Sequence, residues 1–318
     1  MSGSVTYFEA IVIGLVQGVA ELFPVSSLGH AVLIPAFLGG DWAATLNMTA
    51  KQSPYLALVV ALHVATALAL LLFFRNDWIR IIRGLISSVR NRRIQGPYEK
   101  LAWLLVAGTI PVGLAGLVLD KLLREHLGTP LWAGFFLAVN GLVLFSAERL
   151  TGGGSERGSN RGERRKQPAG APLERELDRH GRELPPDIAS DVRLARLTRK
   201  SAAQVGAAQI LGLFPGMSRS GATIVAGVFK GLHHEDAARF AFLLATPVIL
   251  AAGVYKLPEL AKPENSAVLG PAVAGSLVAF VASYVSVRFL TRYFETKSLT
   301  PFAVYCLVVG LGSVAYFA

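Results

Sequence analysis

The sequence has little charge and almost no cysteine. Of its 318 residues, 16% are Asp, Glu, Lys or Arg and 53% are hydrophobic, whereas soluble domains average nearer a quarter charged residues. This composition excludes a soluble globular domain and predicts an all-α integral membrane protein. Cys306 is the single cysteine, so the chain can form no internal disulfide and holds no cysteine metal cluster.

Basic residues are missing from the start of the chain, where the first Lys or Arg is Lys51. The first apolar run therefore lacks the positively charged segment that opens a secretory signal peptide, and we expect no cleaved signal. The net charge of +10 comes mainly from loops, where basic residues orient a membrane protein. It does not indicate nucleic-acid binding, and no nucleic-acid partner is expected.

Six apolar segments are long enough to cross a bilayer core of about 30 Å as helices. Residues 75–100, which follow the first of them, carry seven Lys or Arg against two Asp or Glu. The positive-inside rule therefore places this loop in the cytoplasm. The six predicted spans run near 55–74, 101–119, 131–147, 239–257, 268–290 and 300–318.

Two further apolar stretches, 8–38 and 203–232, are interrupted in the middle by polar residues. Each half of a stretch is too short to cross a membrane, because a spanning helix needs about 20 residues. We therefore expect two re-entrant helix–turn–helix hairpins. Irregular backbone at that depth is tolerated only where it is buried in protein or lines a watery cavity, so the two tips are candidate sites.

These segments divide the chain into two membrane halves, 1–150 and 201–318, which are joined by a polar insert at 151–200. The insert carries twelve Lys or Arg against eight Asp or Glu. Its first half lacks apolar periodicity, so we interpret it as a flexible cytoplasmic linker. Its end, 187–200, is predicted to form an amphipathic helix on the membrane surface.

The two halves contain an internal repeat, because Leu22-Phe23-Pro24-Val25-x-Ser27 aligns with Leu213-Phe214-Pro215-Gly216-x-Ser218. If 75–100 lies inside, then 8–38 enters the membrane from the outer face and 203–232 from the inner face. The halves are thus inverted in topology, and the two tips should meet near the middle of the membrane. Transporters use this architecture for a buried site, so a transport function stays in play.

The residues that the tips bring together suit the cleavage of a phosphate ester or pyrophosphate. Arg219 and backbone N–H groups near Gly216 would hold phosphate oxygens and stabilise developing negative charge. Ser27 is a nucleophile or a phosphate-positioning donor, and His30 is a general base or acid. Glu21 holds a divalent cation or orients His30. The other candidates for phosphate binding are Gln17, Ser26, Ser218, Ser220 and Thr223.

Each of these residues also has a purely structural interpretation. A serine that follows a proline commonly caps a helix, and we favour that kind of role for Ser26 and for Gln17. A charge inside a membrane is costly, so we favour function for Glu21 and Arg219. The two interpretations of His30 are evenly balanced, because a single histidine near an interface is usually only hydrogen-bonded.

Two other polar groups are interpreted as structural. His63 lies in the middle of the span 55–74, where it either lines the cavity or packs with one hydrogen bond, and we favour packing. His233-His234-Glu235-Asp236 has the residue types of a metal cluster, but adjacent positions do not place their side chains on one helix face. We interpret this run as a cap and polar turn that opens the next helix.

Two motifs in the sequence are specific to one family. Gln17-x-x-x-Glu21 followed by Pro24-Val25-Ser26-Ser27-x-Gly29-His30, and the run from Pro215 to Thr223 with its Pro-Gly-x-Ser-Arg-Ser-Gly-Ala-Thr pattern, resemble the signatures of the undecaprenyl-diphosphate phosphatases. These are bacterial enzymes associated with bacitracin resistance. The similarity covers the membrane part and includes Pro301-Phe302-Ala303-x-Tyr305.

The resemblance implies inverted repeats with two re-entrant hairpins and hydrolysis of undecaprenyl diphosphate to the monophosphate and phosphate, helped by Mg²⁺ or Ca²⁺. It implies a multi-pass protein of the bacterial inner (plasma) membrane that recycles the lipid carrier for peptidoglycan. The site would open to the outer face, the partners would be the polyprenyl diphosphate and membrane lipids, and a homodimer stays open. The family's functional positions carry over to Glu21, Ser27, His30, Ser218, Arg219 and Thr223.

The sequence departs from the family pattern in two places. Gln17 stands where many members have Glu, so a cation would rest mainly on Glu21 and on the diphosphate itself. The insert 151–200 is also longer than the usual connection. Two alternatives remain beside the phosphatase: a flippase for polyprenyl phosphate, which the inverted repeats would suit, and a lipid-binding scaffold without catalysis. Release of inorganic phosphate by the purified protein distinguishes the enzyme from both.

Overall fold

Long apolar runs fold into helices in a membrane, because a helix satisfies its backbone hydrogen bonds internally. The computed structural model describes residues 5–48, 54–152, 182–260 and 263–318. The described part contains six helices long and apolar enough to span a bilayer, close to the six predicted segments, and the chain is an all-helical integral membrane protein. These helices are α4 (Pro54–Phe73), α6 (Pro97–Leu127), α7 (Pro130–Gly152), α11 (His234–Leu260), α12 (Ser266–Tyr293) and α13 (Thr300–Phe317).

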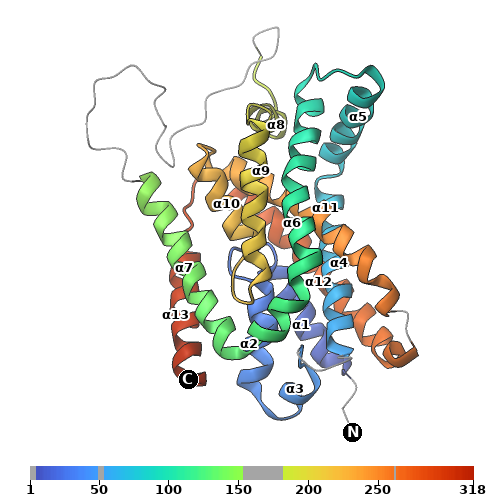
Figure 1. Cartoon of the computed structure of the whole chain (residues 1–318), viewed down its shortest axis with the longest axis vertical. Helices are drawn as coiled ribbons and strands as arrows, with labels where there is room; N and C mark the ends of the chain where they lie inside the picture. Colours follow the sequence, from blue (N-terminus) through green and yellow to red (C-terminus); the bar gives the residue numbers. More distant parts are fainter. Residues whose placement is uncertain (1–4, 49–53, 153–181, 261–262) are drawn as a thin grey trace.

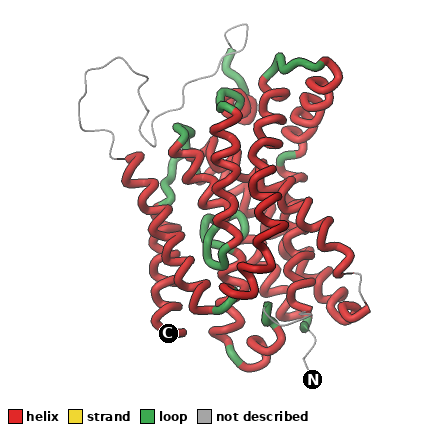
Figure 2. The backbone as a smooth tube through the Cα atoms, in the orientation of Figure 1, coloured by secondary structure: helices red, strands yellow, loops and turns green. Residues whose placement is uncertain are grey.

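The two interrupted stretches form pairs of short helices at the predicted positions. In the first pair, α1 (Tyr7–Ala20) and α2 (Ser27–Leu38) are joined by a turn. In the second, α9 (Arg199–Ala207) continues into the 3₁₀ helix η2 (Ala208–Leu213), and α10 (Arg219–Phe229) follows after a loop. Figure 2 shows loop segments running through the middle of the helical bundle. The irregular backbone of both pairs is therefore enclosed by other helices.

The helices of the two halves pack in a symmetric pattern. Helix α1 of the first half packs against α12 of the second half, and α9 packs against α6 of the first half. Both contacts need glycine. A Cβ on Gly14 of α1 would lie 2.3 Å from the carbonyl oxygen of Gly275, and a Cβ on Gly206 of α9 would lie 2.0 Å from that of Gly108. The same close backbone approach thus occurs at both of these helix contacts.

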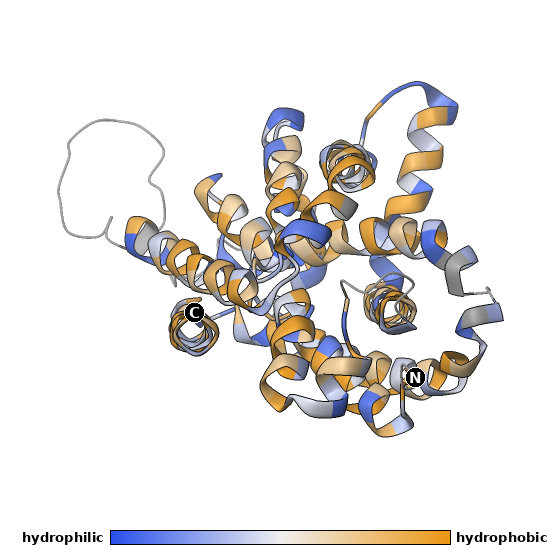
Figure 3. Cartoon of the chain, turned by 60° about the horizontal axis from the view of Figure 1, so that its bottom comes forward, coloured by the Kyte–Doolittle hydropathy of each residue, from blue (hydrophilic) through white to orange (hydrophobic). Residues whose placement is uncertain are grey.

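Polar and basic segments lie at one end of the bundle. Figure 1 shows α5 (Arg75–Asn91) and α8 (Pro186–Leu194) at that end, whereas α3 (Gly40–Thr45) and the end of α13 lie at the other. Figure 3 shows that hydrophobic residues dominate the helices in between. Many of their side chains face outward, including Leu117 at 67% and Leu277 at 65% exposure. Such surfaces require lipid around them.

The prediction that 75–100 is a loop is wrong for its first part, because α5 occupies Arg75–Asn91. This segment is amphipathic as a helix, but its many basic residues give it the composition of a loop. The buried face of α5 packs against the start of α6, where a Cβ on Gly84 would lie 2.8 Å from the carbonyl carbon of Tyr98. The indole N–H of Trp103 also donates to the hydroxyl of Ser88 at 2.9 Å.

The helix predicted over 187–200 is also not continuous. It ends at Leu194, and Thr198 caps the next helix, α9, by accepting a hydrogen bond from the backbone N–H of Ser201 at 3.1 Å. One face of α8 is fully buried against the protein, where Ser190 and Asp191 are 0% exposed. Asp191 of α8 also forms an ion pair with Arg239 of α11. Helix α8 is therefore held against the protein and does not simply lie on a membrane surface. The linker predicted before it falls mostly outside the described residues.

Candidate active site

The first tip is built by the end of α1 and the start of α2. Gln17 and Glu21 are four residues apart and share a helix face, and the Gln17 amide donates to Oε2 of Glu21 at 3.1 Å. The chain then turns, with Ser26 in the left-handed region at φ 68°. The Ser26 hydroxyl accepts from the backbone N–H of Gly29 at 3.1 Å and so caps α2. Ser26 thus caps a helix and also lines the cavity described below, whereas Gln17 contacts the carboxylate of Glu21.

The second tip needs a glycine at its turn. Gly216 has φ +103°, and a Cβ there would lie 2.2 Å from the carbonyl oxygen of Ala133 on α7. Ser218 then caps α10 by accepting from the backbone N–H of Gly221 at 3.1 Å. Arg219 is the first residue of α10, so its side chain leaves the helix at the tip itself.

The two tips touch, and a buried amide links them. A Cβ on Gly29 would lie 2.9 Å from the Cα of Gly216. Asn140, in the middle of α7, is 0% exposed. Its Nδ2 donates to the carbonyl of Pro24 at 2.9 Å, and its Oδ1 accepts from the backbone N–H of Ser218 at 3.1 Å. One side chain of the first half therefore fixes both tips in register.

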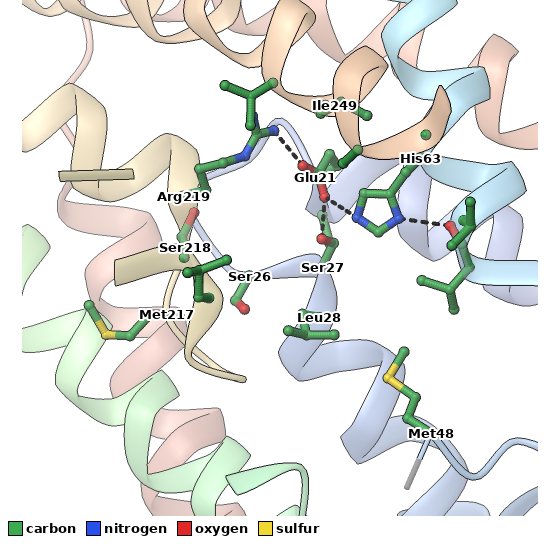
Figure 4. A pocket seen from close by; sticks show the side chains of 18 of the residues that line it. Glu21, Ser26, Ser27, Leu28, Met48, His63, Met217, Ser218, Arg219 and Ile249 are labelled. Carbon is green, nitrogen blue, oxygen red and sulfur yellow. Dashed lines mark hydrogen bonds and ion pairs between the residues drawn. The ribbon is translucent and has the colours of Figure 1, made fainter. Parts of the chain in front are cut away.

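Side chains from three segments converge on the carboxylate of Glu21 (Figure 4). Nη2 of Arg219 donates to Oε1 of Glu21 at 2.5 Å, across the two halves of the chain. The hydroxyl of Ser27 donates to Oε2. Nε2 of His63, from α4, lies 3.3 Å from the same Oε2. Glu21 is 7% exposed, so these interactions form largely away from water.

A cavity of about 210 Å³ opens beside this cluster. Its wall is apolar apart from a few groups that include Glu21, Ser27, His63 and Arg219. In the part of the chain that the structure describes, Nη1 of Arg219 is buried and has no hydrogen-bond partner. A buried donor without a partner is costly. This guanidinium therefore suits an anionic ligand that enters the cavity.

Other predicted site residues contact structural partners. The ring of His30 lies with Nδ1 2.7 Å from the carbonyl of Ser26 and Nε2 2.7 Å from the hydroxyl of Tyr305 on α13. The hydroxyl of Thr223 donates to the carbonyl of Arg219 at 2.7 Å, and that of Ser220 to the carbonyl of Phe23 at 3.2 Å. None of His30, Thr223 and Ser220 is among the residues that line the cavity.

Sequence reasoning missed three polar residues that the structure places at or near the site. His63, which we interpreted as a packing residue, lines the cavity, and so does Lys256 at the end of α11. Asn140 links the tips. The available signal was a polar residue inside an apolar helix, which is costly in a membrane unless it is partnered or functional. His233-His234-Glu235-Asp236 has structural partners: His234 lies 2.8 Å from Glu148, and Asp236 pairs with Arg193.

The expected divalent cation does not fit a site held by the protein. Magnesium and calcium take six or more oxygen ligands, and magnesium is commonly held by one or two carboxylates and substrate phosphates. Here Glu21 is the single carboxylate among the residues lining the cavity, and both of its oxygens accept hydrogen bonds from protein donors. No group of three His, Cys, Asp or Glu suitable for a metal occurs among the described residues.

The fold and the site together define a multi-pass, all-helical membrane protein whose buried cavity suits a phosphate group. A family model described as bacitracin resistance protein BacA matches residues 10–312. The chain belongs to this family.

Three relatives show how far the similarity extends. The chain is 55% identical to the undecaprenyl-diphosphatase of Mycolicibacterium paratuberculosis and 54% identical to that of Mycobacterium avium, with 100% of this chain and 99% of each relative covered. It is 48% identical to undecaprenyl-diphosphatase 2 of Frankia alni, with 98% of both chains covered. The likeness therefore spans whole proteins and includes both tips of the site.

Proposed function

We infer that this protein hydrolyses undecaprenyl diphosphate to undecaprenyl phosphate and inorganic phosphate. Membership of the BacA family supports this function, as do relatives that are named undecaprenyl-diphosphatase and match over their full length. Such an enzyme recycles the lipid carrier of cell-wall synthesis, and its activity is the basis of resistance to bacitracin. The residues gathered at the two tips supply the chemistry.

The observation that carries this proposal is that Nη1 of Arg219, beside the cluster formed by Ser27 and Glu21, has no hydrogen-bond partner in the described part of the chain. Arg219 lines the cavity, and its Nη1 is buried. Nη2 holds Glu21, so Nη1 is left to donate to a phosphate oxygen. Arginine suits phosphate because its donors form a fork that matches the oxygens. As charge develops on the departing and transferred oxygens, this donor stabilises it.

Ser27 is the group best placed to attack. Its hydroxyl already donates to Glu21, so Glu21 takes the proton as Oγ bonds to the terminal phosphorus and the bond to the bridging oxygen breaks. Polyprenyl phosphate leaves, and water then hydrolyses the phosphoserine. His30 acting on water is the other route expected from the sequence. The contact between Ser27 and Glu21 favours the covalent route, because both ring nitrogens of His30 are directed at other groups, the carbonyl of Ser26 and the hydroxyl of Tyr305.

A covalent phosphoserine is directly detectable. Wild-type protein stopped with acid after mixing with a prenyl diphosphate labelled in its terminal phosphate should carry label on Ser27, identified by peptide mass spectrometry. Ser27→Ala should carry none and release little phosphate. Full turnover by Ser27→Ala would instead favour activation of water.

We propose that the two hairpins are re-entrant and that the cavity opens to the outer face of the bacterial inner membrane. The cavity extends from Arg219 to Met48 and Lys256, which lie close to the start of α4 and the end of α11. That end of the bundle is opposite the basic helix α5, which the positive-inside rule assigns to the cytoplasm. A Lys256→Cys variant in a Cys306→Ser background should react with an impermeant maleimide in spheroplasts and fail to react in inverted vesicles.

A divalent cation enters this proposal as part of the substrate. Mg²⁺ or Ca²⁺ bound by the oxygens of the diphosphate would reach the cavity with it, and no step here depends on a cation held by the protein. Titration of the purified protein with Mg²⁺ or Ca²⁺ and without substrate should therefore show no tight binding. A homodimer stays a prediction, because the contacts of one chain do not bear on it.

The competing function is a flippase for polyprenyl phosphate. Purified protein in detergent, given a prenyl diphosphate and Mg²⁺ or Ca²⁺, should release inorganic phosphate, and absence of release would contradict the phosphatase. Glu21→Gln removes the proton acceptor of Ser27 while keeping its size, so it should release little phosphate. Turnover by this variant at the wild-type rate would remove Glu21 from the mechanism.

A further inference from the structure

A histidine in the middle of a spanning helix faces the reaction site. His63 lies within α4, whose residues from Pro54 to Phe73 include no Asp, Glu, Lys or Arg. A polar side chain at that depth marks either a partnered group or a functional one. The side chain of His63 keeps 28% of its surface exposed and lines the cavity beside Glu21.

The two ring nitrogens of His63 have different partners. Nδ1 lies 2.8 Å from the carbonyl oxygen of Val59, one helical turn earlier. The carbonyl of Val59 and the carboxylate of Glu21 only accept, so each ring nitrogen carries a hydrogen in this arrangement and the ring is an imidazolium. The bond fixes the plane of the ring against its own helix. Nε2 is thereby directed away from α4, to a position 3.3 Å from Oε2 of Glu21.

Oε2 of Glu21 is the oxygen that accepts the hydroxyl of Ser27. Arg219 holds the other oxygen, Oε1, from the second half of the chain. His63 approaches Oε2 from the first half. The carboxylate is therefore held at both oxygens by helices that enter from different parts of the fold, and neither oxygen can turn away from its partner without losing a hydrogen bond.

We propose that His63 is a positioning residue of the phosphatase site, which donates a hydrogen bond to Oε2 of Glu21 and keeps that oxygen directed at Ser27. This inference rests on the proposed function. It concerns the transfer of the Ser27 proton and not the binding of the lipid. Loss of the donor should lower kcat and leave KM nearly unchanged.

A neighbouring polar residue shows what a structural role looks like on the same helix. Thr66 is 0% exposed. Its hydroxyl donates to the carbonyl of Leu62 at 3.1 Å and accepts from the hydroxyl of Ser283 on α12, also at 3.1 Å. Thr66 joins two helices and has no contact with the cavity, whereas His63 uses its second polar atom on Glu21. Thr66→Val is therefore a matched control.

Two substitutions separate the two nitrogens of His63. In His63→Gln, the amide nitrogen is as many bonds from Cβ as Nε2, so the donor to Glu21 is kept. In His63→Asn, the amide nitrogen corresponds to Nδ1, so the contact with Val59 is kept and the donor to Glu21 is lost. Both variants lose the charge of the imidazolium alike, so they differ from each other mainly in reach.

The experiment measures phosphate release from farnesyl diphosphate by the purified full-length protein in detergent, with kcat and KM determined for each variant. We expect His63→Asn to lose about 10- to 100-fold in kcat, as when a residue that orients a catalytic ligand is removed. We expect His63→Gln to stay within about threefold of wild type in kcat, because it keeps the hydrogen bond. Thr66→Val should keep its kcat and lower the melting temperature.

Several outcomes would overturn the proposal. These are wild-type kcat in His63→Asn, an equal loss in His63→Asn and His63→Gln, or a loss confined to KM. If His63→Asn does not fold, His63→Leu replaces it, because leucine is favoured in an apolar helix, and the same loss of kcat is expected. Absence of phosphate release by the wild type would contradict the proposed function itself, so the two failures are distinguishable.

Discussion

Two arginine–carboxylate pairs in this protein differ in how many of the arginine nitrogens contact the carboxylate. At the end of the bundle that holds α5 and α8, Arg193 of α8 contacts Asp236 of α11 with two nitrogens, at 2.7 and 2.8 Å, and the hydroxyl of Ser190 donates to the same carboxylate at 2.5 Å. At the tips, Arg219 contacts Glu21 through Nη2 alone, and its Nη1 is buried without a partner among the described residues.

The difference lies in geometry and not in residue type. A fork of two parallel hydrogen bonds uses the carboxylate fully and makes a rigid clamp. In the pair at the tips, only Nη2 of Arg219 contacts the carboxylate, and the pair lies beside a cavity of about 210 Å³. We therefore interpret such a pair as part of a functional site only where one of its donors has no partner and a cavity lies beside it.

The largest expected effect on kcat comes from removing the guanidinium of Arg219, whose Nη1 does not contact Glu21. Arg219→Ala should lower kcat by about a thousandfold, in line with the loss of a group that stabilises transition-state charge. Arg219→Lys should recover little, because an ammonium cannot hold Glu21 and a phosphate oxygen with two fixed nitrogens. Phosphate release by the purified variants measures both. Retained turnover in Arg219→Ala would remove this residue from the site.

The clamp between Arg193 and Asp236 should respond in the opposite way. Asp236→Asn removes the charge that Arg193 contacts with two nitrogens and leaves it the more distant Glu235, at 4.0 Å, which costs about 3 kcal/mol of folding free energy. We expect a lower melting temperature in detergent with kcat per folded molecule unchanged. A fall in kcat with unchanged melting would show that the clamp acts on the site, and the contrast between the two pairs would fail.

Asn140 should show a mixture of both effects, because it is structural but joins the two tips. Asn140→Leu keeps the size and leaves the carbonyl of Pro24 and the backbone N–H of Ser218 without their partner. Each unsatisfied buried group costs about 1–3 kcal/mol. We expect lower stability together with lower kcat. Full activity in a destabilised variant would mean that the tips keep their register without this amide.

The smallest effect is expected at Gln17, whose amide donates to Glu21 at 3.1 Å. Gln17→Glu replaces this donor with a second carboxylate, and like charges at that distance repel. We expect a loss of a few-fold in kcat at low Mg²⁺ and recovery at high Mg²⁺, because two carboxylates and a diphosphate resemble a common magnesium ligand set. A dependence on Mg²⁺ identical to that of wild type would contradict this.

Much of the fold follows from the sequence, because apolar length and charge asymmetry act locally along the chain. The six spans and the positions of both interrupted stretches were predicted in this way and are confirmed. Helix α5 was missed because its pattern of alternating basic and apolar residues resembles a polar loop until α6 is placed against it.

The site was predicted less completely. Glu21, Ser27 and Arg219 were found because charge and hydroxyl groups in an apolar chain are conspicuous, and the structure brings them together. His63 was missed, because a single histidine in a span has the same sequence signal whether it packs or lines a cavity. Its distance of 3.3 Å from Glu21 depends on how α4 lies against α1.

The sequence by itself determined that this is an all-helical membrane protein with polar residues inside two interrupted apolar stretches, since burial of apolar side chains and satisfaction of the backbone leave few other choices. Tertiary structure alone decided which polar groups meet. Partners such as Asn140 and Ser218, or His63 and Glu21, are far apart in the chain. Their meeting depends on the rotation and depth of each helix, which side-chain packing between helices sets.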